Sequence, residues 1–161
     1  MTIHNIPPVY DENSRILILG SFPSVKSREA EFFYGHPQNR FWRVLASVIG
    51  VEAPQTTEEK RSFLLSNKIA VWDVIASCEI DGSADSTIRN VRANDISVIL
   101  ASANIRAIFV NGRTSEKYYN KYIKETVGKE AILLPSTSPA NAASSLDALT
   151  AKWGIIKKYI L

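Results

Sequence analysis

The stretch RILILGSFPS, residues 15–24, joins a short apolar run to a segment of turn-forming residues. Three later runs have the same character, because each is mostly apolar and ends in a polar or turn-forming residue. They are KIAVWD at 68–73, RAIFVN at 106–111 and EAILLPS at 130–136. Short, nearly continuous apolar runs are typical of strands that are covered on both faces. The four runs therefore predict the buried strands of a central sheet.

Helical patterns separate these runs. Apolar residues recur at the spacing of one helix face in two places. These residues are Phe41, Leu45, Val48 and Ile49, and later Leu149, Trp153, Ile156 and Ile160. The segment 56–67 begins with a threonine and has acidic residues in its first turn, and the segment 94–102 begins with Asn94, a preferred helix cap. We expect a helix in each of these segments.

Strands that alternate with helices imply parallel pairing through right-handed crossovers. The sequence therefore predicts an α/β fold, a three-layer α/β/α sandwich with a central four-stranded parallel sheet. In such sheets, ligands bind beyond the carboxyl ends of the strands. The segments that follow the four runs are 20–24, Asp73, 111–113 and 135–142. We expect them to converge on one site.

Length and composition indicate the class of protein. The chain has 161 residues, of which 45% are hydrophobic and 22% charged, as in an ordinary globular domain, so we expect residues 1–161 to form a single domain. No apolar run has the length of a membrane-spanning helix, and the N-terminus lacks the features of a secretory signal. We expect a cytoplasmic protein that does not bind membranes and that is a monomer.

Few residues are available as metal ligands. The chain has one cysteine and two histidines, at spacings that resemble no zinc or iron–sulfur site, so we expect no metal and no cofactor. Cys78 is expected to be buried, together with Trp42, Trp72 and Trp153.

The net charge is compatible with several functions, whereas the motifs argue against a phosphate-binding loop and a serine hydrolase. The net charge of +3 and the pI near 9.0 fit a nucleic-acid partner, and they fit an ordinary, slightly basic enzyme equally well. The loop GSFPSVKS, residues 20–27, has a glycine and a Lys–Ser pair, but a phosphate-binding loop needs a second glycine and the N–H group that Pro23 lacks. A serine hydrolase is also disfavoured, because there is no G-x-S-x-G motif and only His36 is placed to act as a base.

Three motifs in register resemble a known family. LILGSFPS at 17–24, GHPQNRFW at 35–42 and LPSTSPANA at 134–142 resemble motifs of the uracil-DNA glycosylase superfamily. The phrase HPQNRFW is similar to the mismatch-specific uracil glycosylase branch, and the forms GSFPS and STSPAN are most similar to the hypoxanthine (deoxyinosine) DNA glycosylase branch. The resemblance runs from about residue 15 to the C-terminus.

The resemblance implies a DNA repair enzyme. Members of this family flip a damaged base out of the DNA and hydrolyse the bond between base and sugar. No lysine of this chain stands out as an imine-forming nucleophile, so we expect no strand-cutting step. The expected substrate is hypoxanthine, with uracil in G:U mispairs as a second possibility, in double-stranded or single-stranded DNA. The pathway implied is base excision repair.

The first motif departs from the family pattern. In the mismatch-specific branch the third residue of the G-x-x-P loop is an asparagine that holds the attacking water, and here it is Phe22. The resemblance to the hypoxanthine branch implies Asn39 as the catalytic residue instead. Because Asn39 is neutral, we expect it to orient a water or stabilise charge and not to act as a titrating base. Its position before a helical pattern equally suits a helix cap.

Four residues are predicted to contact the base. Phe22 lies in the first motif, and Tyr34 is where the mismatch-specific branch has an aromatic that stacks on the flipped base. His36 is expected to donate a hydrogen bond, and Asp73 to accept N1–H of hypoxanthine. Structural alternatives remain for each: Tyr34 as hydrophobic packing, His36 as a satisfied structural histidine, and Asp73 as a cap.

The loops around the pocket supply further candidates. The first motif contributes Gly20, Ser21 and Pro23, and the segment 81–90 resembles a pocket loop that contributes Ser83, Asp85 and Ser86. The last motif is predicted to contact DNA through Ser136, Ser138, Pro139 and Asn141. The family position of a catalytic histidine in the uracil-specific branch corresponds to Ser136. Ser138 is also a candidate helix cap.

Two functions of different classes follow. The first is a monofunctional DNA glycosylase that acts on a deaminated base. The second is a non-catalytic module of the same fold that binds nucleic acid or a small ligand, which Phe22 and Ser136 would suit.

Overall fold

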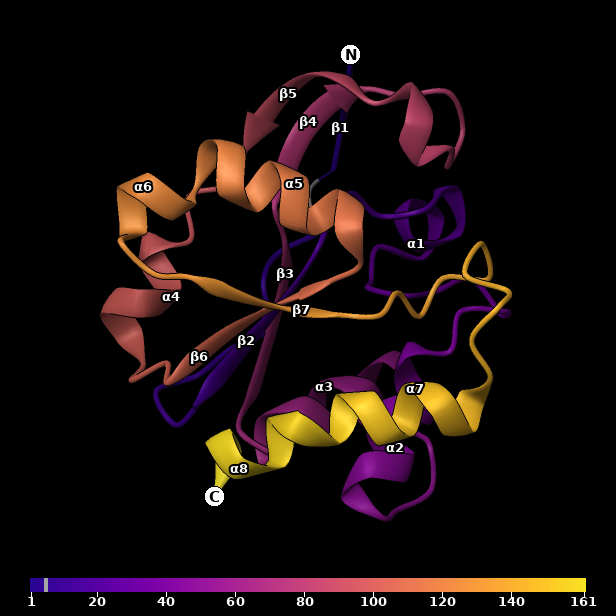
Figure 1. Cartoon of the computed structure of the whole chain (residues 1–161), viewed down its shortest axis with the longest axis vertical. Helices are drawn as coiled ribbons and strands as arrows, with labels where there is room; N and C mark the ends of the chain where they lie inside the picture. Colours follow the sequence, from indigo (N-terminus) through magenta and orange to yellow (C-terminus); the bar gives the residue numbers. More distant parts are fainter. Residues whose placement is uncertain (5) are drawn as a thin grey trace.

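The computed structural model describes residues 1–4 and 6–161. Its centre is a parallel sheet of four strands in the order β3 (Ile69–Asp73), β2 (Ile16–Gly20), β6 (Ala107–Asn111) and β7 (Ala131–Leu134). Gly20 pairs with Asp73, and Asn111 pairs with Leu134, so the carboxyl ends of the strands lie side by side. The predicted four-stranded parallel sheet is confirmed (Figure 1).

Helices cover both faces of this sheet. One face carries α2 (Phe41–Ile49), α3 (Thr57–Ser66), α7 (Leu146–Trp153), the 3-10 turn η2 (Gly154–Ile156) and α8 (Lys157–Ile160). The other carries α4 (Ser97–Ser102), α5 (Arg113–Tyr122) and α6 (Lys124–Val127). The short helix α1 (Val25–Ala30) follows β2 near the carboxyl end of the sheet. The three-layer α/β/α prediction is therefore confirmed (Figure 1).

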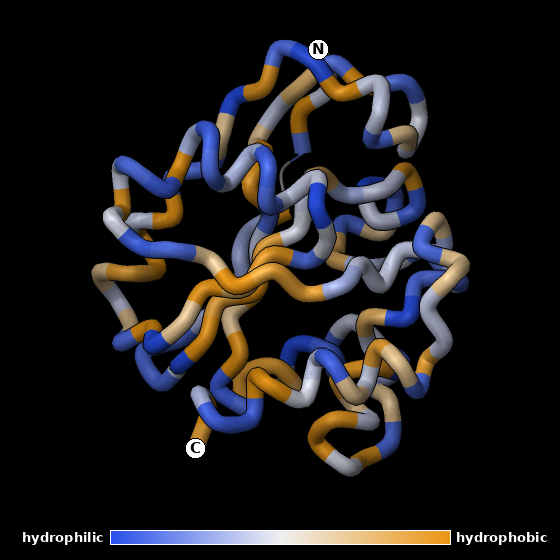
Figure 2. Tube along the Cα trace, viewed as in Figure 1, coloured by the Kyte–Doolittle hydropathy of each residue, from blue (hydrophilic) through white to orange (hydrophobic). Residues whose placement is uncertain are grey.

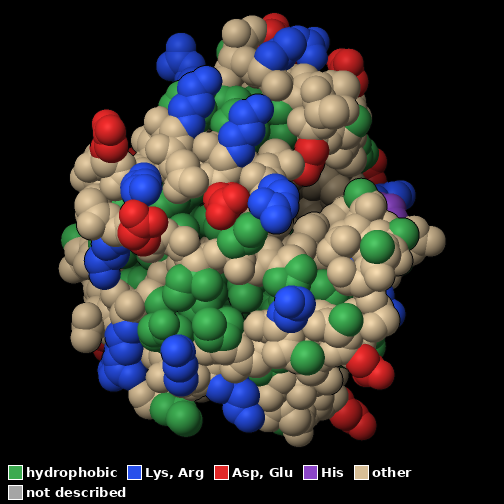
Figure 3. Space-filling view, viewed as in Figure 1, with side chains coloured by type: hydrophobic (Ala, Val, Ile, Leu, Met, Phe, Trp, Pro, Cys, Tyr) green, Lys and Arg blue, Asp and Glu red, His purple; other side chains and the backbone are tan. Residues whose placement is uncertain are grey.

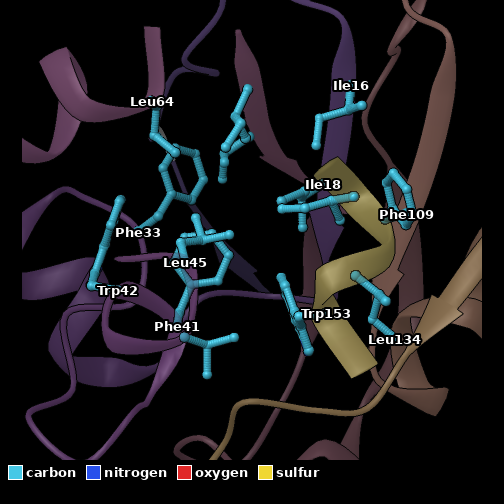
Figure 4. Close-up of a cluster of buried hydrophobic side chains, with 14 of the residues drawn as sticks. Ile16, Ile18, Phe33, Phe41, Trp42, Leu45, Leu64, Phe109, Leu134 and Trp153 are labelled. Atoms are coloured by element: carbon cyan, nitrogen blue, oxygen red, sulfur yellow. The ribbon is translucent and has the colours of Figure 1, made fainter. Parts of the chain in front are cut away.

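Alternate residues of each strand enter the two cores. Ile16 and Ile18 of β2 pack toward α2 and α7, and Leu17 and Leu19 pack toward α4 and α5. Figure 4 shows part of the first core, where Phe41 lies close to Trp153 and Leu45. In Figure 2 the apolar colour is concentrated on the central strands and the polar colour on the outer segments. Burial on both faces is why the strands read as continuous apolar runs.

A second, antiparallel sheet was not predicted. Its order is β1 (Thr2–Ile3), β4 (Ile75–Glu79) and β5 (Arg89–Ala93). The 3-10 turn η1 (Asp85–Thr87) lies between β4 and β5, so the predicted pocket loop 81–90 ends inside a strand. β1 was missed because it is very short, and β5 was missed because it is mostly exposed and has no continuous apolar run.

Two of the expected helix caps are wrong. Thr56 caps α3 as predicted, because its hydroxyl accepts from the N–H of Glu59 at 3.0 Å. Asn94 does not cap α4, since its amide donates to the carbonyl of Asp73 at 2.9 Å. Ser138 is not the cap of the C-terminal helix either, because Ser145 caps α7.

The burial predictions are largely confirmed. Cys78 and Trp153 are fully buried and Trp42 is nearly so, whereas Trp72 is only partly buried and donates its indole N–H to the carbonyl of Ile6. Within residues 1–4 and 6–161, no helix combines the length and the apolar character needed to cross a membrane.

Candidate active site

The carboxyl ends of the parallel strands surround a cavity of about 310 Å³. Figure 3 shows the surface hollowed on the right of the view, above the loop that follows β7. Every residue predicted for the site lines this cavity except Ser86 and Asn141. Six further lining residues had no individual role predicted: Ser24, Ser27, Phe33, Asn111, Thr137 and Ala140. The segments after the four strands therefore do converge.

The floor of the cavity requires a glycine at position 20. A Cβ atom on Gly20 would lie 2.6 Å from Oδ1 of Asp73 and 3.0 Å from the hydroxyl oxygen of Tyr34. Both distances are shorter than ordinary van der Waals contact. The absence of a side chain at Gly20 therefore lets the carboxyl group and the phenol approach the same point.

Asp73 is a buried carboxyl group with an unsatisfied oxygen. Its side chain is almost fully enclosed, and burial raises the pKa of Asp73 to about 7. Within the described chain, Oδ2 is buried and has no hydrogen-bond partner. Oδ1 is the oxygen that lies over Gly20. The group is therefore close to its titration point at neutral pH, and a bound molecule can change the balance.

The neighbouring histidine does not neutralise this carboxylate. Nε2 of His4 lies 3.8 Å from Oδ2 of Asp73, but it is 2.8 Å from the carbonyl of Ile75, and Nδ1 accepts from the N–H of Ile6. These contacts fix the tautomer with the proton on Nε2. Burial lowers the pKa of His4, so the ring is neutral at pH 7. Asp73 therefore has no cationic partner in His4.

Tyr34 lies beside Asp73 with its hydroxyl on the cavity floor. The ring stacks on Phe41 with a centroid separation of 3.8 Å, so one of its two faces is already covered. The hydroxyl oxygen accepts from Nδ2 of Asn111 at 3.3 Å. Burial and the nearby Asp73 raise the pKa of Tyr34 above its ordinary value, so the phenol stays protonated. Tyr34 therefore offers the cavity an O–H donor as well as a ring face.

Asn39 is held by two hydrogen bonds to one atom. Its Oδ1 accepts from the N–H of Phe41 and from the hydroxyl of Thr137, both at 2.9 Å. The first bond satisfies a free N–H group at the start of α2, but Arg40 and not Asn39 occupies the N-cap position, so Asn39 supports the helix from the preceding residue. It does not exclude the predicted catalytic role, because Asn39 also lines the cavity.

Thr137 and Asn111 extend this arrangement into a network. Thr137 is fully buried, and its N–H donates to Oδ1 of Asn111 at 3.1 Å. Nδ2 of Asn111 donates to the Thr137 hydroxyl at 3.0 Å. Asn111 is the last residue of β6, and Thr137 follows β7, so the network ties the ends of two strands to the start of α2.

Phe22 forms an apolar wall. It is 8% exposed, its ring meets His4 edge-on at 5.2 Å, and the guanidinium carbon of Arg28 lies 5.3 Å from its centroid. His36 is only partly buried, and its Nδ1 accepts from the N–H of Gln38 at 3.1 Å. That local contact leaves Nε2 of His36 as the atom for the predicted donation.

One of the loops that border the cavity is held by a helix. The loop 81–86 is joined to α1, because Arg28 donates to the carbonyl of Gly82 at 2.7 Å and the hydroxyl of Ser83 accepts from the N–H of Val25 at 3.0 Å. Ser83 and Asp85 line the cavity, and Ser86 does not. Ser83 and Asp85 therefore have the position expected of residues in a pocket loop.

Arg40 holds the loop that follows β7. Its guanidinium donates to the carbonyls of Ser138 and Asn141, at 3.2 and 2.9 Å, and to that of Ser144. The amide of Asn141 donates to the carbonyl of Ser136 at 2.9 Å, so it closes the loop and does not line the cavity. Arg40 was not predicted, although its place beside Asn39 in the second motif was a signal.

The sequence comparison identifies the family. The model of the uracil DNA glycosylase superfamily matches residues 7–158. The chain belongs to this superfamily. The motifs that suggested the resemblance are the segments that surround the cavity, so the family match and the geometry agree.

Individual relatives within the superfamily carry a narrower description. A protein of Methanosarcina barkeri (strain Fusaro) named hypoxanthine DNA glycosylase is 38% identical over 146 residues, which cover 89% of this chain and 91% of the relative. A protein of the same name from Methanosarcina acetivorans is 38% identical over 143 residues, which cover 88% and 89% of the two chains. A solution NMR structure described as a candidate uracil DNA glycosylase, also from Methanosarcina acetivorans, has a TM-score of 0.84 at 34% identity and covers 99% of each chain.

Proposed function

We propose that this protein is a monofunctional DNA glycosylase that hydrolyses the N-glycosidic bond of hypoxanthine in base excision repair. The observation that carries the proposal is the pair of groups over Gly20, a carboxylate oxygen of Asp73 and the hydroxyl of Tyr34. This pair is an acceptor next to a donor at the bottom of a cavity. The relatives named hypoxanthine DNA glycosylase support the same assignment.

The pair is complementary to the edge that deamination creates. Hypoxanthine presents N1–H, a donor, beside O6, an acceptor, whereas adenine presents an acceptor at N1 and a donor at N6. Asp73 accepts from N1–H and Tyr34 donates to O6. Adenine in the same position would set its N1 acceptor against the Asp73 acceptor and its N6 donor against the Tyr34 donor. Uracil carries the same N–H and carbonyl pair, so uracil in a G:U mispair is a second substrate.

The reaction proposed is direct hydrolysis. Breaking the glycosidic bond gives the sugar oxocarbenium character and leaves negative charge on the departing base. Asn39 is the catalytic residue, because it borders the cavity and is held rigidly by Phe41 and Thr137. Among the described residues that line the cavity there is no lysine, so the chain offers no amine there for an imine with the sugar.

The DNA is proposed to bind along the loop that follows β7. Ser138 and Pro139 line the mouth of the cavity, and the loop is held in place by Arg40. Figure 3 shows Lys and Arg side chains scattered over the visible face among Asp and Glu, so this face carries no continuous basic stripe. The enzyme acts as a cytoplasmic monomer on double-stranded or single-stranded DNA that contains the lesion.

The proposal is tested with oligonucleotides that contain deoxyinosine, deoxyuridine or deoxyxanthosine, followed by alkaline cleavage at abasic sites. We expect the strongest cleavage at deoxyinosine, weaker cleavage at deoxyuridine opposite guanine, and none at deoxyadenosine. Borohydride should trap no covalent complex. If no lesion gives an abasic site at enzyme excess, the proposal fails and a non-catalytic binding module is the better description.

A further inference from the structure

We propose that Thr137 and Asn111 fix the amide of Asn39 so that only its N–H groups face the base. Asn39 then acts as a hydrogen-bond donor to the departing base and does not hold the attacking water through its carbonyl. The inference rests on the proposed function, since it concerns how that reaction is catalysed. It makes Thr137 and Asn111 positioning residues for the reaction.

The orientation of Asn39 follows from a backbone donor. The N–H of Phe41 can only donate, so the side-chain atom 2.9 Å away must be an acceptor. That atom is therefore Oδ1 and not Nδ2. Flipping the amide would set two donors against each other at the start of α2, which removes the usual ambiguity between oxygen and nitrogen.

The orientation of the Thr137 hydroxyl follows from the contacts between Thr137 and Asn111. The backbone N–H of Thr137 donates to Asn111, which requires Oδ1 of Asn111 at that position. Nδ2 of Asn111 is then the atom 3.0 Å from the Thr137 hydroxyl oxygen, and it must donate. The hydroxyl proton is therefore free to point at Oδ1 of Asn39, 2.9 Å away. A chain of fixed donors leads from β6 to Asn39.

These contacts use the acceptor capacity of Asn39. A carbonyl oxygen has two lone pairs, and the Phe41 N–H and the Thr137 hydroxyl occupy both. None of the hydrogen bonds found among residues 1–4 and 6–161 involves Nδ2 of Asn39. The group that Asn39 presents to the cavity is therefore an NH₂ group with two donors.

A donor at this place stabilises the leaving group. In the reaction, the C1′–N9 bond breaks and its electron pair goes to the purine, while the water oxygen bonds to C1′. The proton that the water loses ends, through solvent, on the released base. Nδ2–H can stabilise the negative charge on the purine during this step, but it cannot accept a proton from water. Preorganised donors of this kind are effective because they need no reorientation in the transition state.

The first test replaces the NH₂ group by oxygen. Asn39→Asp keeps the shape and both acceptor contacts, but it presents a carboxylate to the base. We expect the single-turnover rate of hypoxanthine release to fall roughly 10²–10³-fold, with DNA affinity changed little. If Asn39 instead held the water as an acceptor, Asn39→Asp would keep or exceed the wild-type rate, and that result would overturn the inference.

The second test addresses the positioning residues. Thr137→Val should lower the single-turnover rate about tenfold, and Thr137→Ser should restore it, because serine keeps the hydroxyl. In an Asn39→Ala background, Thr137→Val should have no further effect, since the group it orients is gone. Thr150→Val, which removes a hydroxyl that bonds within α7, is the matched control and should leave the rate unchanged. Equal rate losses from Thr137→Val in both backgrounds would contradict the positioning role.

The orientation can also be measured without turnover. A neutron structure of the free protein in deuterated solvent locates deuterium directly, and we expect it on the Asn39 atom that faces away from Phe41. Deuterium on the atom that faces Phe41 would overturn the inference even for an active enzyme. If the wild type releases no base from any lesion, the proposed function fails, while the neutron result still decides the orientation.

Discussion

The two sides of the cavity floor differ in how completely their polar groups are satisfied. At the end of β3, Asp73 keeps a buried oxygen with no partner within the described chain. At the ends of β6 and β7, Asn111 and Thr137 bond to each other and to Asn39. An unsatisfied buried group costs stability, and a satisfied network gives rigidity. This difference fits the roles proposed above, which are recognition for the Asp73 side and catalysis for the Asn39 side.

Of the changes that test this comparison, replacing the Asp73 carboxylate should have the largest effect. Burial raises the pKa of Asp73 from its ordinary value near 4 to about 7, so the folded protein binds a proton more tightly than the unfolded chain. The contribution of Asp73 to the free energy of unfolding is therefore most favourable at low pH, falls as the pH rises from about 4 to 7, and stays low above 7. Asp73→Asn should therefore stabilise the protein at pH 8 by on the order of 4 kcal/mol, and by progressively less as the pH falls toward 4. Urea unfolding at several pH values measures this.

The same substitution should remove a pH dependence of activity. If only ionised Asp73 accepts N1–H of hypoxanthine, kcat/KM of the wild type should be about tenfold lower at pH 6 than at its plateau above pH 7. Asp73→Asn should have a low activity without this inflection. A wild-type profile that is flat between pH 6 and 8 would contradict the proposed role of Asp73 in recognition.

Filling the space between the two groups should have the next largest effect. Gly20→Ala sets a methyl group against Oδ1 of Asp73 and the Tyr34 hydroxyl, so the recognition pair must move apart. We expect activity to fall about 10²-fold and stability to fall by about 1–3 kcal/mol. Gly154→Ala is the matched control, because a Cβ there meets nothing within 4 Å and activity should not change. Equal activity of the two variants would show that the floor is not used.

Removing only the donor of the pair should have a smaller effect. Tyr34→Phe deletes the hydroxyl and keeps the ring that stacks on Phe41. Loss of one neutral hydrogen bond to O6 should lower kcat/KM for hypoxanthine roughly fivefold to tenfold. If the ring face alone mattered, as the sequence suggested, Tyr34→Phe would match the wild type. Measuring kcat/KM for the two proteins therefore separates recognition through the hydroxyl from stacking.

The sequence predicts the features of the molecule that leave a pattern in neighbouring residues. The strands β2 and β6 were found because burial on both faces leaves an uninterrupted apolar run. The contact of Asn39 with the start of α2 was found because it involves a residue two positions along the chain. The bond between Asn39 and Thr137 joins residues 98 positions apart, and no local pattern encodes it. Long-range hydrogen bonds therefore define the Asn39 side of the cavity, and only the fold reveals them.

The smallest effect is expected where the Asn39 side meets the loop that follows β7, which we propose binds DNA. Arg40→Lys keeps the charge, but a lysine cannot reach the carbonyls of Ser138, Asn141 and Ser144 as a planar fork does. We expect the loop to loosen, so that affinity for lesion DNA falls about threefold while the single-turnover rate at saturation changes less. Arg43→Lys, at an exposed position of α2, is the matched control for the charge. A loss confined to the rate, with affinity intact, would mean that Arg40 acts through its neighbour Asn39 and not through the loop, because its backbone N–H also bonds to Thr137.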